Sequence, residues 1–279
     1  MLKDLIAIVD NVEASQDFVG QAVGFAEAQE AHLAVTLLTK ENLPFVAIPP
    51  YEAYYPVDQN SDRQQEGLDA LRRLTARTAV PVEIRGVLDA AAYLSGVSRV
   101  EGRYADVLLI GSEASFDDVR LRRRLIETAV MSSGGPVLIL PDGSSSKGSL
   151  GRVRRAAVGW DASSEARRAL RDLMTVIEPG GHIDIVIVDP DDTLAGQAES
   201  PGSEIGRYLA RHGYEVEIHH ESSSGGKIIS GVLEAFALSS GADLLVIGAF
   251  AHPRIRDILL GGVTRELVAK AGLPLLLSR

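Results

Sequence analysis

The chain has 279 residues and a net charge of −10, and it contains no cysteine. That length suits two ordinary domains, and the acidic balance argues against a nucleic-acid partner because the phosphate backbone would be repelled. The missing cysteines exclude disulfides and thiolate catalysis. No apolar run approaches the roughly 18 residues of a membrane span, so we expect a soluble cytoplasmic protein without a membrane partner.

The first half alternates short apolar segments with helical patterns. Buried strands are predicted over residues 5–10, 32–38, 82–85, 105–111 and 136–140. A helical pattern covers residues 14–29, and a Pro- and Tyr-rich insertion over 43–56 predicts a surface loop. Strands that alternate with helices indicate a parallel sheet with helices on both faces.

The second half repeats this unit. Its predicted strands cover residues 156–161, 182–188, 216–219, 242–248 and 274–278, and a helical pattern covers 164–177. The matches in the same order predict an α/β protein with two tandem doubly wound domains. Each would hold a five-stranded, mainly parallel sheet in the order 3-2-1-4-5. We place the first domain at 1–141, a Ser- and Gly-rich linker at 142–152 and the second domain at 153–279.

The segment 248–265 follows the fourth strand of the second half, and ligands of such sheets bind at the carboxyl ends of strands. Within it, Gly261 and Gly262 precede a predicted helix over 263–271. Bare backbone N–H groups and the helix dipole favour an anion there, and the Thr264 hydroxyl could add a donor. The local alternative, which these residues alone favour, is a glycine cap that ends a short helix over 254–260.

The first half differs at this point. Arg123 and Arg124 align with the two glycines, within a basic run over 120–124. That run could hold an anion by its side chains, but a solvated or interdomain helix face is the favoured interpretation. The first half is therefore predicted to be degenerate as a binding site.

The repeated unit, an Asp closing the first strand of each half (Asp10 and Asp161) and the late glycine loop resemble the universal stress protein family in its tandem bacterial form. Nucleotide-binding members carry Gly, two residues, Gly, nine residues, then Gly with Ser or Thr. Gly248 and Gly261 match this motif, whereas Ala251 and Gly262 depart from it.

The resemblance implies a noncatalytic, stress-responsive protein with an ATP or AMP site in the second half, and it leaves the need for Mg²⁺ open. It places Asp161 against adenosine, Val188 near adenine, and residues 261–264 at the ribose and phosphates. The predicted nucleotide-binding residues are Trp160, Asp161, Val188, Gly248, His252, Gly261, Gly262, Val263 and Thr264. It also implies that the two domains pair along their last strands and that the protein forms a homodimer.

Other chemistry finds little support in the sequence. No nucleophile with a base and an orienting acid stands out, so no catalytic residue is predicted. No metal site is predicted, because the adjacent His219 and His220 point to opposite faces of one strand. Two alternative functions stay open: a weak ATPase that uses Asp161, and an interaction module whose binding sites are both vestigial.

Overall fold

The computed structural model describes residues 2–41, 59–143, 150–190, 201–249, 262–270 and 272–279. The strands of the first half are β1 (Asp4–Val9), β2 (His32–Lys40), β3 (Val82–Asp89), β4 (Val107–Ile110) and β5 (Val137–Ile139). Its helices are α1 (Gln16–Gln29), α2 (Gln59–Leu74), α3 (Val97–Glu101) and α4 (Val119–Ser132), with short 3-10 turns at Leu94–Gly96, Gly102–Tyr104 and Glu113–Ser115.

The second half follows the same order. Its strands are β6 (Val153–Gly159), β7 (Ile177–Val188), β8 (Glu215–Glu221), β9 (Leu244–Gly248) and β10 (Leu275–Ser278), and its helices are α5 (Ser164–Val176), α6 (Ser203–Arg211), α7 (Ile229–Ser239) and α8 (Gly262–Lys270). Every predicted strand is present. The predicted short helix over 254–260 and the Pro- and Tyr-rich insertion lie outside the described residues.

β7 is longer than its apolar pattern indicates. The strand begins at Ile177, directly after α5, although only 182–188 was predicted. Val153 pairs with Ile177 and Arg155 with His182, so a bulge between these pairs absorbs the extra residues. Gly180, at φ 77°, adopts the left-handed conformation within this stretch.

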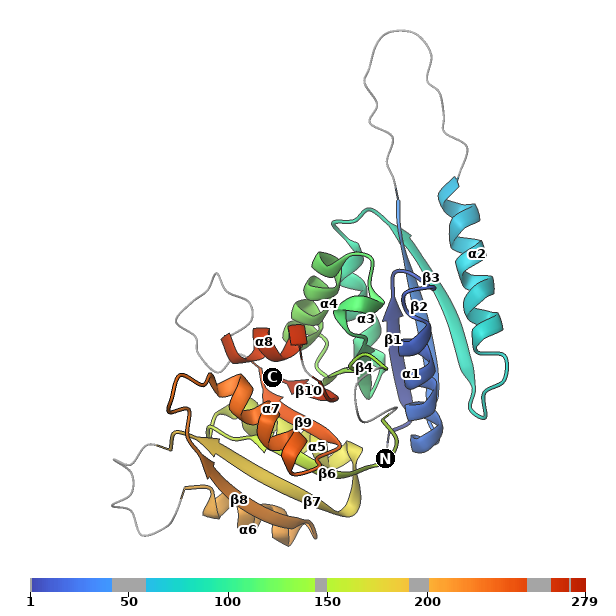
Figure 1. Cartoon of the computed structure of the whole chain (residues 1–279). Coiled ribbons are helices and arrows are strands. Elements are labelled where there is room, and N and C mark those ends of the chain that lie inside the picture. The colour runs from blue at the N-terminus through green and yellow to red at the C-terminus, as the bar shows by residue number, and fades with distance from the viewer. Residues whose placement is uncertain (1, 42–58, 144–149, 191–200, 250–261, 271) are drawn as a thin grey trace.

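All strands join in one ten-stranded sheet in the order β3-β2-β1-β4-β5-β10-β9-β6-β7-β8 (Figure 1). The order within each half is the predicted 3-2-1-4-5, with parallel neighbours. The halves meet where β5 and β10 pair antiparallel, with Leu138 opposite Leu276. This seam confirms the expected pairing of the two domains along their last strands.

Two apolar layers lie against the sheet, one on each face. Buried residues of α1, α2, α5 and α6 pack on one face, and those of α4, α7 and α8 pack on the other together with Leu94. Strands such as β4 are buried along their whole length, as expected of a parallel sheet covered on both faces. Each layer contains residues from both halves, so the core is continuous across the seam.

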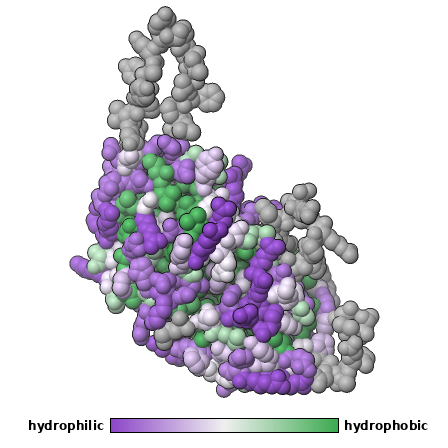
Figure 2. All heavy atoms as spheres, turned by 180° about the vertical axis from the view of Figure 1, so that it is seen from behind, coloured by the Kyte–Doolittle hydropathy of each residue, from purple (hydrophilic) through white to green (hydrophobic). Residues whose placement is uncertain are grey.

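The surface is mixed in character. Seen from behind in Figure 2, polar residues dominate, with apolar patches between them. Among the described residues, no helix combines the length and the apolar character needed to cross a bilayer.

Candidate functional site

Three adjacent strands, β9, β6 and β7, end at the same edge of the sheet (Figure 1). In the register, Gly159 of β6 lies opposite Ile247 of β9 and Val186 of β7. The predicted site residues at these strand ends are Trp160, Asp161, Val188 and Gly248. The topology therefore brings this part of the predicted site together at the edge where ligands of such sheets bind.

The turn after β6 exposes a carboxylate. Trp160 donates its backbone N–H to Val186 O at 2.9 Å and packs, half-buried, on the core. Asp161 is exposed, and its Oδ1 accepts the backbone N–H of Ser163 at 3.0 Å. The next residue, Ala162, is held at φ 57°, in the left-handed region. The turn thus presents the Asp161 carboxylate at the rim of the edge.

Gly248 has a structural reason to be glycine. A Cβ atom there would lie 2.4 Å from the backbone N of Ala166 and 2.6 Å from the carbonyl C of Glu165. Any side chain would collide with the first turn of α5, so this residue serves the close packing of β9 on that helix. Its match to the family motif is explained without a ligand.

The described part of α8 begins with an exposed glycine. This helix leads back to β10, which runs parallel to β9, so its first residue lies at the same edge as Asp161. Gly262 is exposed, and a Cβ atom there would meet no atom of the described residues within 4 Å. Val263 packs partly buried on the core, whereas Thr264 is only 4% exposed, so its hydroxyl is not presented to solvent. His252, Gly261 and Ala251 lie outside the described residues.

The equivalent edge of the first half is occupied by the chain itself. The Asp10 carboxylate accepts the backbone N–H groups of Asp117 at 3.0 Å and Asp118 at 2.9 Å. Burial raises the pKa of Asp10 in spite of these two bonds. Asp118 in turn caps α4, since its Oδ1 accepts the N–H groups of Arg120 at 2.9 Å and Leu121 at 3.0 Å. An internal carboxylate therefore fills the helix N-terminus that an anion would need.

Asp118 also has a cationic partner. Lys40 Nζ lies 2.6 Å from its Oδ2, and this hydrogen bond is the main cause that lowers the pKa of Asp118. The carboxylate that caps α4 is thus held in its charged form.

Arg123 and Arg124 align with the two glycines by sequence position, as expected, but the structure of the first half differs there. Arg123 and Arg124 do not stand at a helix start, because α4 begins at Val119 and both are exposed within it. Asp118 lies directly before α4 and supplies its side-chain cap. The start of α4 is therefore closed by Asp118 and not by the two arginines.

One arginine of the basic run over 120–124 contacts the second half of the chain. Arg122 is 1% exposed, and its guanidinium donates to Gly111 O at 2.7 Å and to Val268 O of α8 at 3.0 Å. Burial lowers the pKa of Arg122 to about 10. The prediction of a solvated or interdomain helix face is confirmed. Arg122 faces the second half, and Arg123 and Arg124 are exposed to solvent.

A second group of polar side chains was missed by sequence reasoning. Asp184 is fully buried in β7, and Arg155 of β6 binds both of its carboxylate oxygens, at 2.7 and 2.9 Å. His182 and His219 also contact this carboxylate. The sequence did contain a signal for this group, because Asp184 is a charged residue within the apolar run of 182–188. A buried carboxylate needs polar partners, so such partners could have been expected nearby.

The model of the universal stress protein family matches residues 152–279. The second half belongs to the universal stress protein family. No curated protein matches the chain. A universal stress protein from Archaeoglobus fulgidus is 16% identical, with a TM-score of 0.70, over 99% of this chain and 96% of that one. A protein of unknown function from Pseudomonas aeruginosa is 13% identical, with a TM-score of 0.60, over 99% of this chain and 92% of that one.

The likeness to the Archaeoglobus protein extends the universal stress protein fold to the first half, because that structure covers nearly the whole chain. The chain is thus two such folds in tandem, in agreement with the resemblance seen in its sequence. The family and the fold support a binding module of the stress-protein type.

Proposed function

We propose that this universal stress protein is a noncatalytic, stress-responsive sensor whose second half binds an adenine nucleotide, ATP or AMP. The observation that carries the proposal is the asymmetry between the two halves. Within the described residues, Asp161 is exposed and no atom lies within 4 Å of a Cβ position on Gly262, whereas in the first half Asp10 and the start of α4 are satisfied by the chain's own groups. Binding is therefore proposed for the second half alone.

Each predicted group has a chemical role in this proposal. The exposed Asp161 carboxylate can accept hydrogen bonds from the ribose or the adenine. Val188, half-buried at the end of β7, offers an apolar surface for the base. The first N–H groups of a helix have no partner within the helix, so those of α8 are the groups we assign to the phosphates, helped by the helix dipole. Thr264 is buried, so we assign its part to the backbone N–H.

A bound nucleotide would act by linkage. A ligand that binds only the folded state stabilises it, and one that binds one conformation better shifts the population toward that conformation. Affinity for a partner protein or a second copy would then change with nucleotide level. The homodimer that the resemblance implies stays a prediction, which sedimentation with and without nucleotide can test.

Thermal unfolding with millimolar ATP, ADP and AMP, each with and without Mg²⁺, tests the proposal. At 100 times the dissociation constant the ligand should stabilise by about 2.7 kcal/mol, which raises the midpoint by several degrees. In Gly262→Arg this shift should vanish, because the new side chain enters open space and fills the cradle without disturbing the fold.

Gly20→Arg is the matched control, since Gly20 is also an exposed helix glycine with nothing near its Cβ position. That variant should keep the nucleotide shift. A shift that survives Gly262→Arg would contradict binding at this edge. No shift with any nucleotide would favour the vestigial interaction module, and phosphate release that is lost in Asp161→Ala would favour the weak ATPase.

A further inference from the structure

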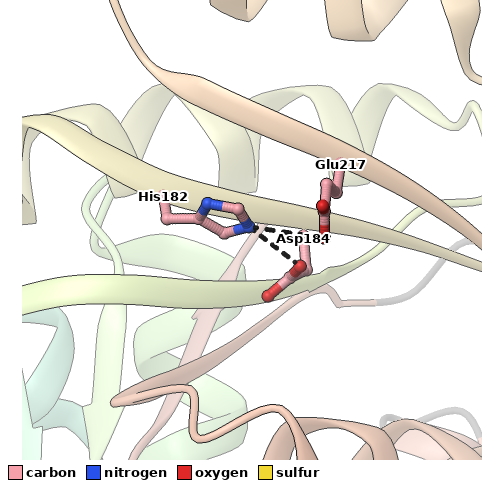
Figure 3. A group of neighbouring side chains, drawn as sticks. All are labelled: His182, Asp184 and Glu217. Atoms are coloured by element: carbon pink, nitrogen blue, oxygen red, sulfur yellow. Dashed lines mark hydrogen bonds and ion pairs between the residues drawn. The ribbon is translucent and has the colours of Figure 1, made fainter.

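Polar side chains of β6, β7 and β8 gather on one face of the second half, beside α7. Side chains alternate along a strand, so His182 and Asp184 share this face on β7, and Glu217 and His219 share it on β8. The register places Asp184 opposite Glu217. His219 stacks against Phe236 of α7, with ring centroids 4.6 Å apart. Figure 3 shows His182, Asp184 and Glu217 converging from the two strands.

The distances within this cluster are those of a ligand set. His182 Nε2 lies 3.2 Å from Asp184 Oδ1 and 3.8 Å from Glu217 Oε2. His219 Nε2 lies 3.0 Å and 3.5 Å from the same two oxygens. The ligand atoms of His182, Asp184 and Glu217 all lie within 4.8 Å of one another. Each imidazole therefore turns the same nitrogen toward both carboxylates.

Neutralising a buried carboxylate does not account for all of these groups. Arg155 already pairs with both oxygens of Asp184. The remaining carboxylates, Glu217 and Glu215, add negative charge beside His182. Three carboxylates therefore lie beside His182, and Arg155 pairs with one of them.

We propose that His182, Asp184 and Glu217 form a binding site for a divalent transition metal ion of the zinc class, with His219 beside the two carboxylates. Zn²⁺ takes imidazole and carboxylate ligands at about 2.0–2.2 Å, and a tetrahedron of such bonds places neighbouring ligand atoms about 3.3 Å apart. The four imidazole–carboxylate distances lie on either side of that value. The ion binds the Nε2 lone pair of a neutral imidazole, so that the single ring proton resides on Nδ1, and a second ring proton, where one is present, passes to solvent.

Outer partners are also in place. Metal-binding histidines commonly direct their other ring nitrogen to a carboxylate, which fixes the ring. His182 Nδ1 lies 3.6 Å from Glu215 Oε2 on the neighbouring strand. Arg155 holds Asp184 Oδ2 through its Nε, at 2.7 Å, and so orients the carboxylate. Its second bond, 2.9 Å long, reaches Asp184 Oδ1, the oxygen that also faces the two imidazoles.

The first half provides an internal comparison. His32 occupies the place of His182, since it pairs with Asp4 as His182 pairs with Arg155. The positions that correspond to Asp184 and His219 hold Ala34 and Arg85. A missing carboxylate and a fixed cation leave no ligand set there, so we expect one metal site per chain.

The test is calorimetric titration of the full chain, stripped with a chelator, with Zn²⁺, followed by visible absorption with Co²⁺ as a geometry probe. We expect one Zn²⁺ per chain and the intense bands of tetrahedral Co²⁺. His182→Ala and Glu217→Gln should each weaken Zn²⁺ binding at least tenfold. Glu217 is 60% exposed, so its substitution should leave the fold intact.

Two histidine variants serve as controls. His220→Ala removes the adjacent histidine of β8, whose Nε2 lies 3.1 Å from Pro201 O, and His32→Ala removes the first-half counterpart. Both should retain Zn²⁺ affinity and the Co²⁺ spectrum. The proposal is overturned if Zn²⁺ binding does not saturate, or if His182→Ala and Glu217→Gln bind as tightly as the controls. Because the site lies apart from Asp161 and Gly262, its failure would leave the nucleotide proposal untouched.

Discussion

Glu30 ends α1 in a conformation that suits glycine. Its φ of 53° and ψ of 43° are left-handed, and its N–H bonds to the carbonyls of Ala26 and Glu27. Glu30→Gly should therefore stabilise the protein by about 0.5 to 1 kcal/mol, because glycine adopts this conformation without strain. The pair it loses, with Arg152 at 4.0 Å, is exposed and contributes little.

Urea unfolding measures this change in stability. Gln29→Gly, one residue earlier and still helical, is the matched control and should destabilise by about 1 kcal/mol. Equal losses in the two variants would show that Glu30 is not strained.

The carboxyl of Asp184 makes a stability contribution that depends on pH. Burial raises its pKa, but the hydrogen bonds from Arg155 and His219 outweigh burial, and the net direction is downward. The folded protein then binds fewer protons than the unfolded chain, so the stabilisation is present above about pH 4 and is lost as the pH falls through the folded pKa.

Asp184→Asn should cost about 3 kcal/mol at pH 7, the lower end for breaking a buried pair, because Arg155 keeps contact with solvent. The difference in free energy of unfolding between wild type and Asp184→Asn, measured by urea unfolding, should decrease as the pH is lowered from 5 to 3. If this difference in free energy of unfolding stays constant across the range, the charged form of Asp184 is not what stabilises the protein.

At the scale of elements, Arg122 of α4 secures the end of α8. A cation near a helix C-terminus satisfies late carbonyls and complements the dipole, and Arg122 bonds to Val268 O across the domain boundary. Arg122→Ala should cost about 2 kcal/mol, from lost packing and a lost charge-assisted bond. Arg122→Met should cost less, because it keeps volume and removes the buried charge.

Arg124→Ala is the control for this helix, since Arg124 is exposed on α4, and it should change stability by less than about 0.5 kcal/mol. Urea unfolding compares the three variants. If Arg122→Ala and Arg124→Ala change the free energy of unfolding equally, the contact between α4 and α8 does not stabilise the protein.

Elements were easier to predict than the contacts between them. Short apolar runs such as 107–110 and 244–247 are too short for typical helices and were predicted as buried strands, and their order placed Asp161 and Gly248 at one edge. The apolar pattern could not predict that Asp118 caps α4, because this cap depends on how the loop before the helix folds back onto Asp10. The same holds for Asp184, whose partners on β6 and β8 are set by strand register and by the bulge in β7.

At the scale of the whole molecule, the seam between β5 and β10 makes the two halves one body. Leu138 and Leu276 face each other there and both are fully buried. Both apolar layers continue across the seam, so a change in one half can reach the other through packing. The division of labour we propose, with a closed first half and an open second half, is thus built into a single sheet.

The most direct test of that division is the number of nucleotides bound per chain, measured by calorimetric titration of the full-length protein with ATP and with AMP. One nucleotide per chain, lost in Gly262→Arg and retained in Gly20→Arg, is the predicted result. Two per chain would show that the Asp118 cap does not close the first half. None would contradict nucleotide binding at the open edge of the second half.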